Sequence, residues 1–170
     1  MGFLIWKKQR NNLSRKLIKR PRITAKDIID RLISNYHYDC QEWACIKELR
    51  IGTGYGGMNE SRVDLFCINC WQSKGNIRVA YEVKVSKQDF LKEIARPLKR
   101  APALMISNQF YFATPPGLCD PNKIPLEAGL IEIDENGQCN KIIDAIWRDT
   151  YPPTWPLLAS IARRKVDTNS

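Results

Sequence analysis

Two charged side chains stand two positions apart in an otherwise apolar run of the sequence. The run AYEVKV, from Ala80 to Val85, holds a carboxylate at Glu82 and an ammonium at Lys84. Charges in a buried strand are costly unless they are paired or bound to something. Because alternate side chains of a strand point to the same face, Glu82 and Lys84 share a face. The pair is therefore either a structural salt bridge or part of a chemical site.

A third charged residue, Asp64, lies in the preceding strand candidate, residues 62–68. Turn residues separate this strand from the next one, which predicts an antiparallel hairpin. A suitable register would bring Asp64 beside Glu82, on the same face as Lys84. Two neighbouring carboxylates raise each other's pKa unless a cation lies between them. Mg²⁺ takes one or two carboxylates together with waters and substrate phosphates.

The chemistry that this arrangement favours is attack of a metal-activated water on a phosphodiester. Lys84 would orient the water and neutralise charge that develops on the phosphate, as a compact cation can. The alternative is an exposed Glu82–Lys84 salt bridge, which is common in sequences and contributes little free energy. The surrounding sequence favours a chemical site over a salt bridge. The pair lies in an apolar strand, a strand with an aspartate precedes it, and a helix capped by Ser86 follows directly.

The periodicity of apolar residues and the capping signals predict the elements that must position these side chains. Residues 43–51 fit a helix or a strand equally well, and residues 52–60 form a glycine-rich loop without the Gly-Lys-Ser/Thr of a phosphate-binding loop. The other expected elements are helices over 24–36, 86–96 and 157–165, and strands over 62–68, 77–85, 103–107, 110–114 and 129–134.

This order of elements predicts an α/β fold with a mixed β-sheet flanked by helices. A length of 170 residues favours one domain. We expect that domain over residues 23–170, with a proline-rich C-terminal extension from about residue 151.

The net charge of +9 is concentrated at the N-terminus. Residues 1–22 hold eight basic residues and no acidic one, which leaves 19 basic against 18 acidic residues elsewhere. A basic arm suits phosphate backbones or another anionic surface, although a solvated terminus with no partner fits equally well.

No apolar run approaches the roughly 20 residues that a membrane-spanning helix needs, and the apolar start is too short for a signal-peptide core. We therefore expect a cytoplasmic protein that does not bind membranes. Reduced thiols are the default there for the six cysteines. Cys67 and Cys70 have the spacing of a zinc knuckle, with Cys40 and Cys45 as a further pair, so a structural zinc site is an alternative. The single histidine, His37, is expected to be structural or superficial.

The runs RVDLF and AYEVKVSKQDFLKE together resemble the PD-(D/E)XK, or restriction-endonuclease-like, nuclease superfamily. The similarity is greatest to small phage and bacterial members, including MmcB-like proteins linked to DNA repair, and extends from about residue 48 to residue 133. It implies a restriction-endonuclease-like mixed sheet, binding of Mg²⁺ or Mn²⁺ by Asp64 and Glu82, and a catalytic role for Lys84. A homodimer is also implied, since many members cut two strands as dimers.

Two departures from the family pattern are visible. Val63 stands where the family has a proline before the aspartate, and the helix expected at 24–36 has no glutamate. Glu48, in preference to Glu42, is assigned the role of that glutamate as a fourth catalytic residue.

The expected function is that of a metal-dependent deoxyribonuclease in DNA repair, recombination or phage DNA processing. The nucleic-acid-binding candidates are Lys87, Arg62 and Tyr55, of which Tyr55 lies in the glycine-rich loop. A nucleic-acid-binding protein of the same fold without catalytic activity is the alternative. An interaction protein whose hairpin charges form only a salt bridge is a further one.

Overall fold

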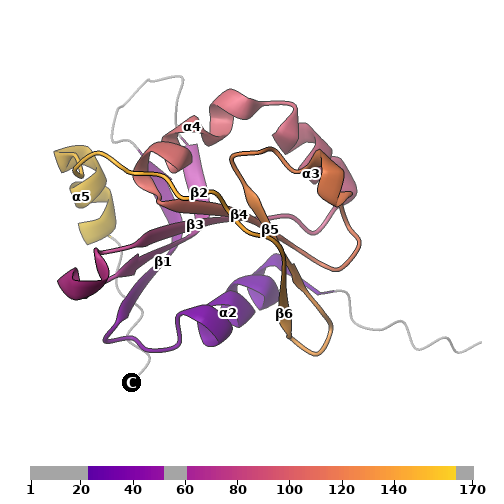
Figure 1. Cartoon of the computed structure of the whole chain (residues 1–170), viewed down its shortest axis with the longest axis horizontal. Coiled ribbons are helices and arrows are strands. Elements are labelled where there is room, and N and C mark those ends of the chain that lie inside the picture. The colour runs from indigo at the N-terminus through magenta and orange to yellow at the C-terminus, as the bar shows by residue number, and fades with distance from the viewer. Residues whose placement is uncertain (1–22, 52–60, 164–170) are drawn as a thin grey trace, which may run out of the picture.

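The structure is a computed structural model that describes residues 23–51 and 61–163 (Figure 1). The predicted basic arm, the glycine-rich loop with Tyr55 and the last seven residues lie outside the described residues. The described part is α/β: a six-stranded mixed sheet with four α-helices against it. The fold class predicted from the sequence is therefore confirmed.

The six strands lie in the sheet in the order in which they occur in the chain. Neighbouring strands are antiparallel except for β3–β4 and β4–β5, which are parallel. The strands are β1 (Trp43–Ile51), β2 (Ser61–Asn69), β3 (Arg78–Val83), β4 (Gln109–Thr114), β5 (Gly129–Ile133) and β6 (Cys139–Ile143).

Helices cover both faces of this sheet, with α2 on one face and α3 and α4 on the other (Figure 1). The α-helices are α2 (Ala25–Tyr36), α3 (Lys87–Ile94), α4 (Pro97–Ile106) and α5 (Trp155–Ala162), and the 3₁₀ turns are η1 (Gln72–Lys74) and η2 (Pro121–Lys123). Helix α5 packs against β1 and contributes Leu157 to the core under α3 and α4. The proline-rich end thus adds a helix to the layer that contains α3 and α4.

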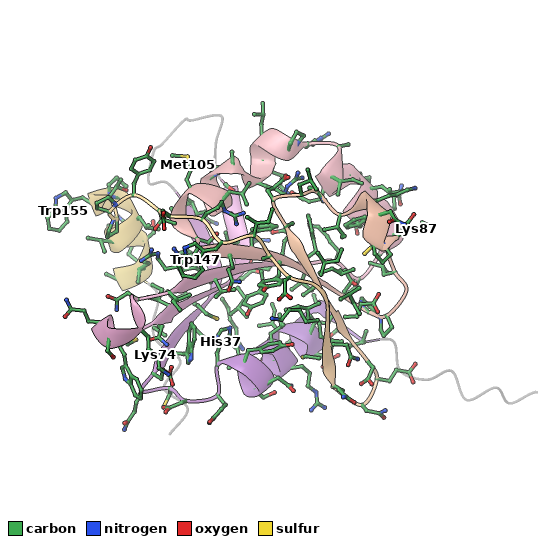
Figure 2. All side chains as sticks on the ribbon, viewed as in Figure 1. His37, Lys74, Lys87, Met105, Trp147 and Trp155 are labelled. Carbon is green, nitrogen blue, oxygen red and sulfur yellow. The ribbon has the colours of Figure 1, made fainter. Side chains whose placement is uncertain are left out.

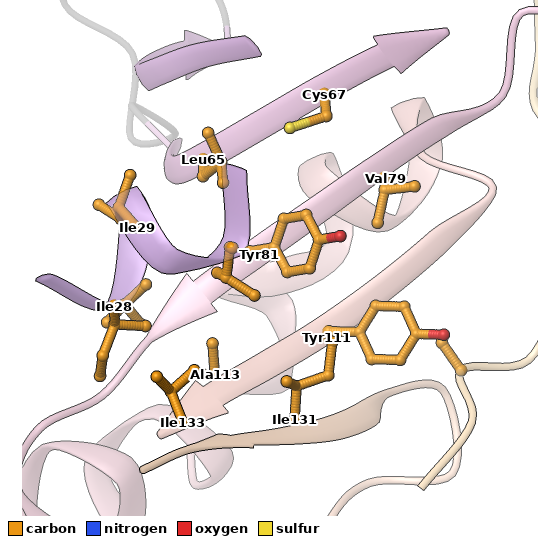
Figure 3. Close-up of a cluster of buried hydrophobic side chains, with 13 residues drawn as sticks. Ile28, Ile29, Leu65, Cys67, Val79, Tyr81, Tyr111, Ala113, Ile131 and Ile133 are labelled. Atoms are coloured by element: carbon orange, nitrogen blue, oxygen red, sulfur yellow. The ribbon is translucent and has the colours of Figure 1, made fainter. Parts of the chain in front are cut away.

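Each face of the sheet carries its own apolar core. Under α2, Ile28 and Leu32 meet side chains from β2 to β5, among them the stacked rings of Tyr81 and Tyr111 (Figure 3). On the other face, Phe90 of α3 packs edge-on against Phe112 of β4. The central strands β3 and β4 are therefore buried on both sides.

Local sequence explains why α2 and α3 begin where they do. The Asp27 N–H donates to Oγ1 of Thr24, and the Thr24 N–H donates to the Asp27 carboxylate, which completes a capping box. In the same way the Asp89 N–H donates to Oγ of Ser86, the residue before α3. Both predicted helix starts are confirmed.

The secondary structure differs from the sequence-based prediction at one segment, resolves one ambiguity and adds one strand. Of residues 103–107, expected as a strand, all but the last belong to helix α4, which begins with Pro97 and buries Arg100 and Ala103, and Ser107 is its C-cap. The ambiguous segment 43–51 is strand β1. Strand β6, with three of its five residues exposed, was not expected after the turn at Gly137. Among the described residues, no helix is both long and apolar enough to cross a bilayer.

Candidate functional site

The carboxylates of Asp64 and Glu82 meet where β3 ends and β2 begins. The antiparallel register pairs Leu65 with Tyr81, so the next position along the ladder places Asp64 opposite Glu82. The Val83 N–H donates to Oδ2 of Asp64 over 2.8 Å, which fixes that carboxylate against the end of β3. The register needed to bring the two acids together is therefore present.

Lys84 lies directly after β3, between two carboxylates. Its Nζ is 2.6 Å from Oε1 of Glu82 and 3.3 Å from Oε2 of Glu93, a residue of α3. The Lys84 side chain is 12% exposed, and those of Glu82 and Glu93 are 10% and 5% exposed. The alternative prediction, an exposed salt bridge between Glu82 and Lys84, is wrong, because helices α3 and α4 cover this face of β3.

The burial of these charges changes their protonation. Burial, together with the nearby charge of Asp64, raises the pKa of Glu82 to about 7. Burial also raises the pKa of Asp64, against the lowering effect of the Val83 hydrogen bond and Lys84. For Lys84, burial favours the neutral amine, but Glu82, Glu93 and Asp64 outweigh it and raise its pKa. The group thus has an excess of negative charge and a lysine that stays protonated.

Glu93 is a member of this group that sequence reasoning did not identify. Besides Lys84 it binds Lys99, whose Nζ is 2.7 Å from Oε2 of Glu93. The guanidinium of Arg100, itself buried, donates to the Glu93 backbone carbonyl and pairs with Glu127. The available signal was helical spacing: Glu93 lies three positions after the buried Phe90, on the inner side of α3.

Glu48 lies on β1 beside Asp64, the place that its proposed role requires. The ladder pairs Lys47 with Leu65 and Leu49 with Val63, which sets Glu48 across from Asp64. The negative charge of Glu48 is among the influences that raise the pKa of Asp64. Its φ is 56°, in the left-handed region that non-glycine residues rarely adopt, and such strain gathers at functional sites.

The nucleic-acid-binding candidates fall in different surroundings. Lys87 is exposed at the first residue of α3, close in sequence to Lys84 and at the end of the molecule opposite to Trp155 (Figure 2). Arg62 is about half exposed and pairs with Glu48 through a 2.7 Å contact. Tyr55 lies outside the described residues.

Carboxylate oxygens, such as those of Asp64 and Glu82, are the donors that hard cations prefer. Within residues 23–51 and 61–163, no group of three or more His, Cys, Asp or Glu side chains could hold a metal ion. A zinc site built from Cys40, Cys45, Cys67 and Cys70 is therefore not formed in this structure. Mg²⁺ and Mn²⁺ need fewer protein ligands, and the unbalanced negative charge of Asp64 and Glu82 fits such an ion.

Comparisons with known proteins bear on the fold only. No protein-family model matches the chain, and no curated protein matches it. Among solved structures, the chain is similar to the SPO1766 protein of unknown function from Silicibacter pomeroyi, with a TM-score of 0.54 and 18% identity. That similarity covers 82% of this chain and 80% of the other. The resemblance to PD-(D/E)XK nucleases stays a prediction.

Proposed function

We propose that the protein is a metal-dependent nuclease that hydrolyses phosphodiester bonds of DNA. The observation that carries this proposal is the meeting of Asp64, Glu82 and Lys84 at the end of β3, with both carboxylates shifted toward higher pKa. An ion pair of Lys84 is already formed with Glu82 and Glu93. Asp64 adds a third carboxylate beyond the two that Lys84 contacts, and its charge raises the pKa of Glu82.

In this mechanism Asp64 and Glu82 would hold Mg²⁺ or Mn²⁺, which would supply Lewis-acid activation of water. Lys84, protonated and held by Glu82 and Glu93, orients the attacking water and offsets the charge that builds up on the phosphate. Glu48 would act through its negative charge on Asp64. Tethering Lys84 at two points limits its rotamers, so that little ordering is needed at the moment of reaction.

Phosphate binding is the second part of the proposal. Lys87 and Arg62 are exposed near the site and would contact the DNA backbone, as would Tyr55 and the basic residues before residue 23. The setting that we propose is DNA repair, recombination or phage DNA processing in the cytoplasm, with a homodimer as the form that cuts two strands.

The test uses wild-type protein, Asp64→Asn and Lys84→Met on labelled duplex, single-stranded, flapped and four-way DNA, each with Mg²⁺, Mn²⁺ or EDTA. Asparagine keeps the acceptor for the Val83 N–H, so the contact between β2 and the end of β3 is preserved. Lys141→Met is the matched control, because Lys141 lies on β6, away from the group, and pairs with the exposed Asp144 just after that strand.

We expect cleavage by wild type and the control in Mg²⁺ or Mn²⁺, none in EDTA, and a loss of at least roughly 100-fold in both site variants. Binding of DNA without cleavage by folded wild-type protein on every substrate would contradict the nuclease. It would support the alternative, a DNA-binding protein of this fold without catalytic activity.

A further inference from the structure

Cys45 and Cys67 face one another across the β1–β2 ladder. The register pairs them directly, and their sulfur atoms are 3.2 Å apart, with the Cys67 thiol donating to Cys45. Residues directly opposite in antiparallel strands have Cα atoms about 4.5–5.5 Å apart. That spacing falls within the range of about 4.4–6.8 Å found for disulfides. The two thiols are thus placed for bond formation without movement of the backbone.

The two cysteines differ in access to solvent. Cys67 is fully buried under α2, on the same face of the sheet as Leu65, Val79 and Tyr81 (Figure 3). Cys45 is partly exposed at the edge of that core. An oxidant in solution therefore reaches Cys45 first and Cys67 only through it.

We propose that Cys45 and Cys67 are a reversible oxidation site, which peroxides convert into a disulfide between β1 and β2. The Cys45 thiolate attacks the peroxide oxygen and becomes a sulfenic acid, and the O–O bond breaks. The Cys67 sulfur then attacks Sγ of Cys45 and expels hydroxide, which takes the Cys67 proton and leaves as water. Two thiols lose two electrons and two protons, and hydrogen peroxide is reduced to two waters.

The order of the two steps agrees with the acidity of the thiols. The hydrogen bond from Cys67 lowers the pKa of Cys45, and burial raises the pKa of Cys67. The more acidic thiol is thus the accessible one, which is the usual arrangement of an attacking cysteine and its resolving partner.

The bond would act on the strands that carry the proposed catalytic residues. Glu48 and Asp64 lie three positions further along the same two strands. The disulfide closes a loop over residues 45–67, which contains both of them, and ties β1 to β2 beside the site. The inference stands on the two thiols alone and does not depend on nuclease activity.

The test requires a background in which the bond can be assigned. Cleavage after Lys and Arg leaves Cys40 and Cys45 in one peptide and Cys67 and Cys70 in another. The double variant Cys40→Ser, Cys70→Ser removes this ambiguity, since both cysteines are exposed and outside the core. The folded variant is treated with hydrogen peroxide, its remaining thiols are alkylated, and the digest is mapped with and without dithiothreitol.

We expect one cross-linked peptide pair that contains Cys45 and Cys67, the loss of two titratable thiols per chain, and full reversal by dithiothreitol. Adding Cys45→Ser should abolish the cross-link, whereas adding Cys139→Ser, a control of similar exposure, should leave it intact. Recovery of both thiols alkylated, overoxidation of Cys45 without a cross-link, or pairing of either with another cysteine would overturn the proposal.

Discussion

The carboxylate of Glu93 holds two lysines at once. It lies 3.3 Å from Lys84 and 2.7 Å from Lys99, and these contacts lower its pKa although burial acts in the opposite direction. Its place on α3 therefore links the helix that follows β3 to the charged group at the end of β3. A buried carboxylate with two cationic partners positions Lys84 rather than merely solubilising a helix.

Replacing Glu93 with glutamine should lower the free energy of unfolding by about 2 kcal/mol, because two charge-assisted hydrogen bonds become weaker. Urea unfolding at neutral pH measures the change. Lys92→Gln on the same helix is the control, since Lys92 is exposed and its nearest acid is 3.8 Å away. Equal effects of the two substitutions would show that the Glu93 contacts contribute no more than a surface pair.

His37 is a core residue, so the structure selects the first of its two expected roles, structural or superficial. It follows α2, is 4% exposed, and lies with Nε2 2.7 Å from the Tyr81 hydroxyl and its ring against Trp43. Burial lowers the pKa of His37 to about 4 from its ordinary value of 6.5. The folded protein thus keeps this imidazole neutral at pH values where the unfolded chain protonates it.

Between pH 6.5 and about 4, the unfolded chain binds one more proton at His37 than the folded protein does. The free energy of unfolding should therefore fall with decreasing pH across this window, by about 3 kcal/mol from this residue. Urea unfolding from pH 7 to pH 4 gives the slope, and His37→Gln removes the contribution of the imidazole. Parallel curves for wild type and variant would refute the assignment.

At the scale of elements, the sequence predicts those parts of the fold where local signals and tertiary packing agree. Capping residues locate α2 and α3, and the alternation of apolar residues locates β2 and β3 to within two residues. The apolar run at 103–107 is too short to distinguish a buried helix from a strand by periodicity. Exposed β6 has no apolar face that would mark it.

The residues of the site likewise divide into those that local sequence signals reveal and those that only tertiary packing reveals. Asp64, Glu82 and Lys84 could be found because they interrupt apolar strands, whose register follows from the hairpin. Glu93 has only a weak signal, its spacing of three positions from Phe90, because an acid among the lysines of α3 looks much the same in sequence whether it faces water or the sheet. Only the packing of α3 on β3 and β4 decides which way it points.

The left-handed backbone conformation of Glu48 in β1 predicts which substitutions the position tolerates. At a φ of 56°, a residue with a Cβ carries roughly 1 kcal/mol of strain, and glycine carries almost none. Glu48→Gly should therefore be more stable than Glu48→Ala by about 1 kcal/mol, although glycine weakens an ordinary strand. Both variants lose the carboxylate, so their difference in urea unfolding isolates the backbone. A more stable alanine variant would show that the conformation is unstrained.

At the scale of the whole molecule, we expect the two neighbouring carboxylates to lower the free energy of unfolding as long as no cation is bound. In metal-free buffer at pH 8, Asp64→Asn should be more stable than wild type by about 1 kcal/mol, because it removes the repulsion between Asp64 and Glu82. Mg²⁺ or Mn²⁺ should raise the Tm of wild type and leave that of the variant unchanged. Equal shifts in the two proteins, or none in either, would contradict ion binding by Asp64.

The agreement between strand order and chain order has a consequence for how the protein is made. Each strand that leaves the ribosome can join the edge formed by the strand before it, so the sheet can grow in the direction of synthesis without rearrangement. The contacts of α2 with β6 and of α5 with β1 are exceptions, because each joins an early element to a late one. The contact between α5 and β1 must wait until residue 162 has been translated.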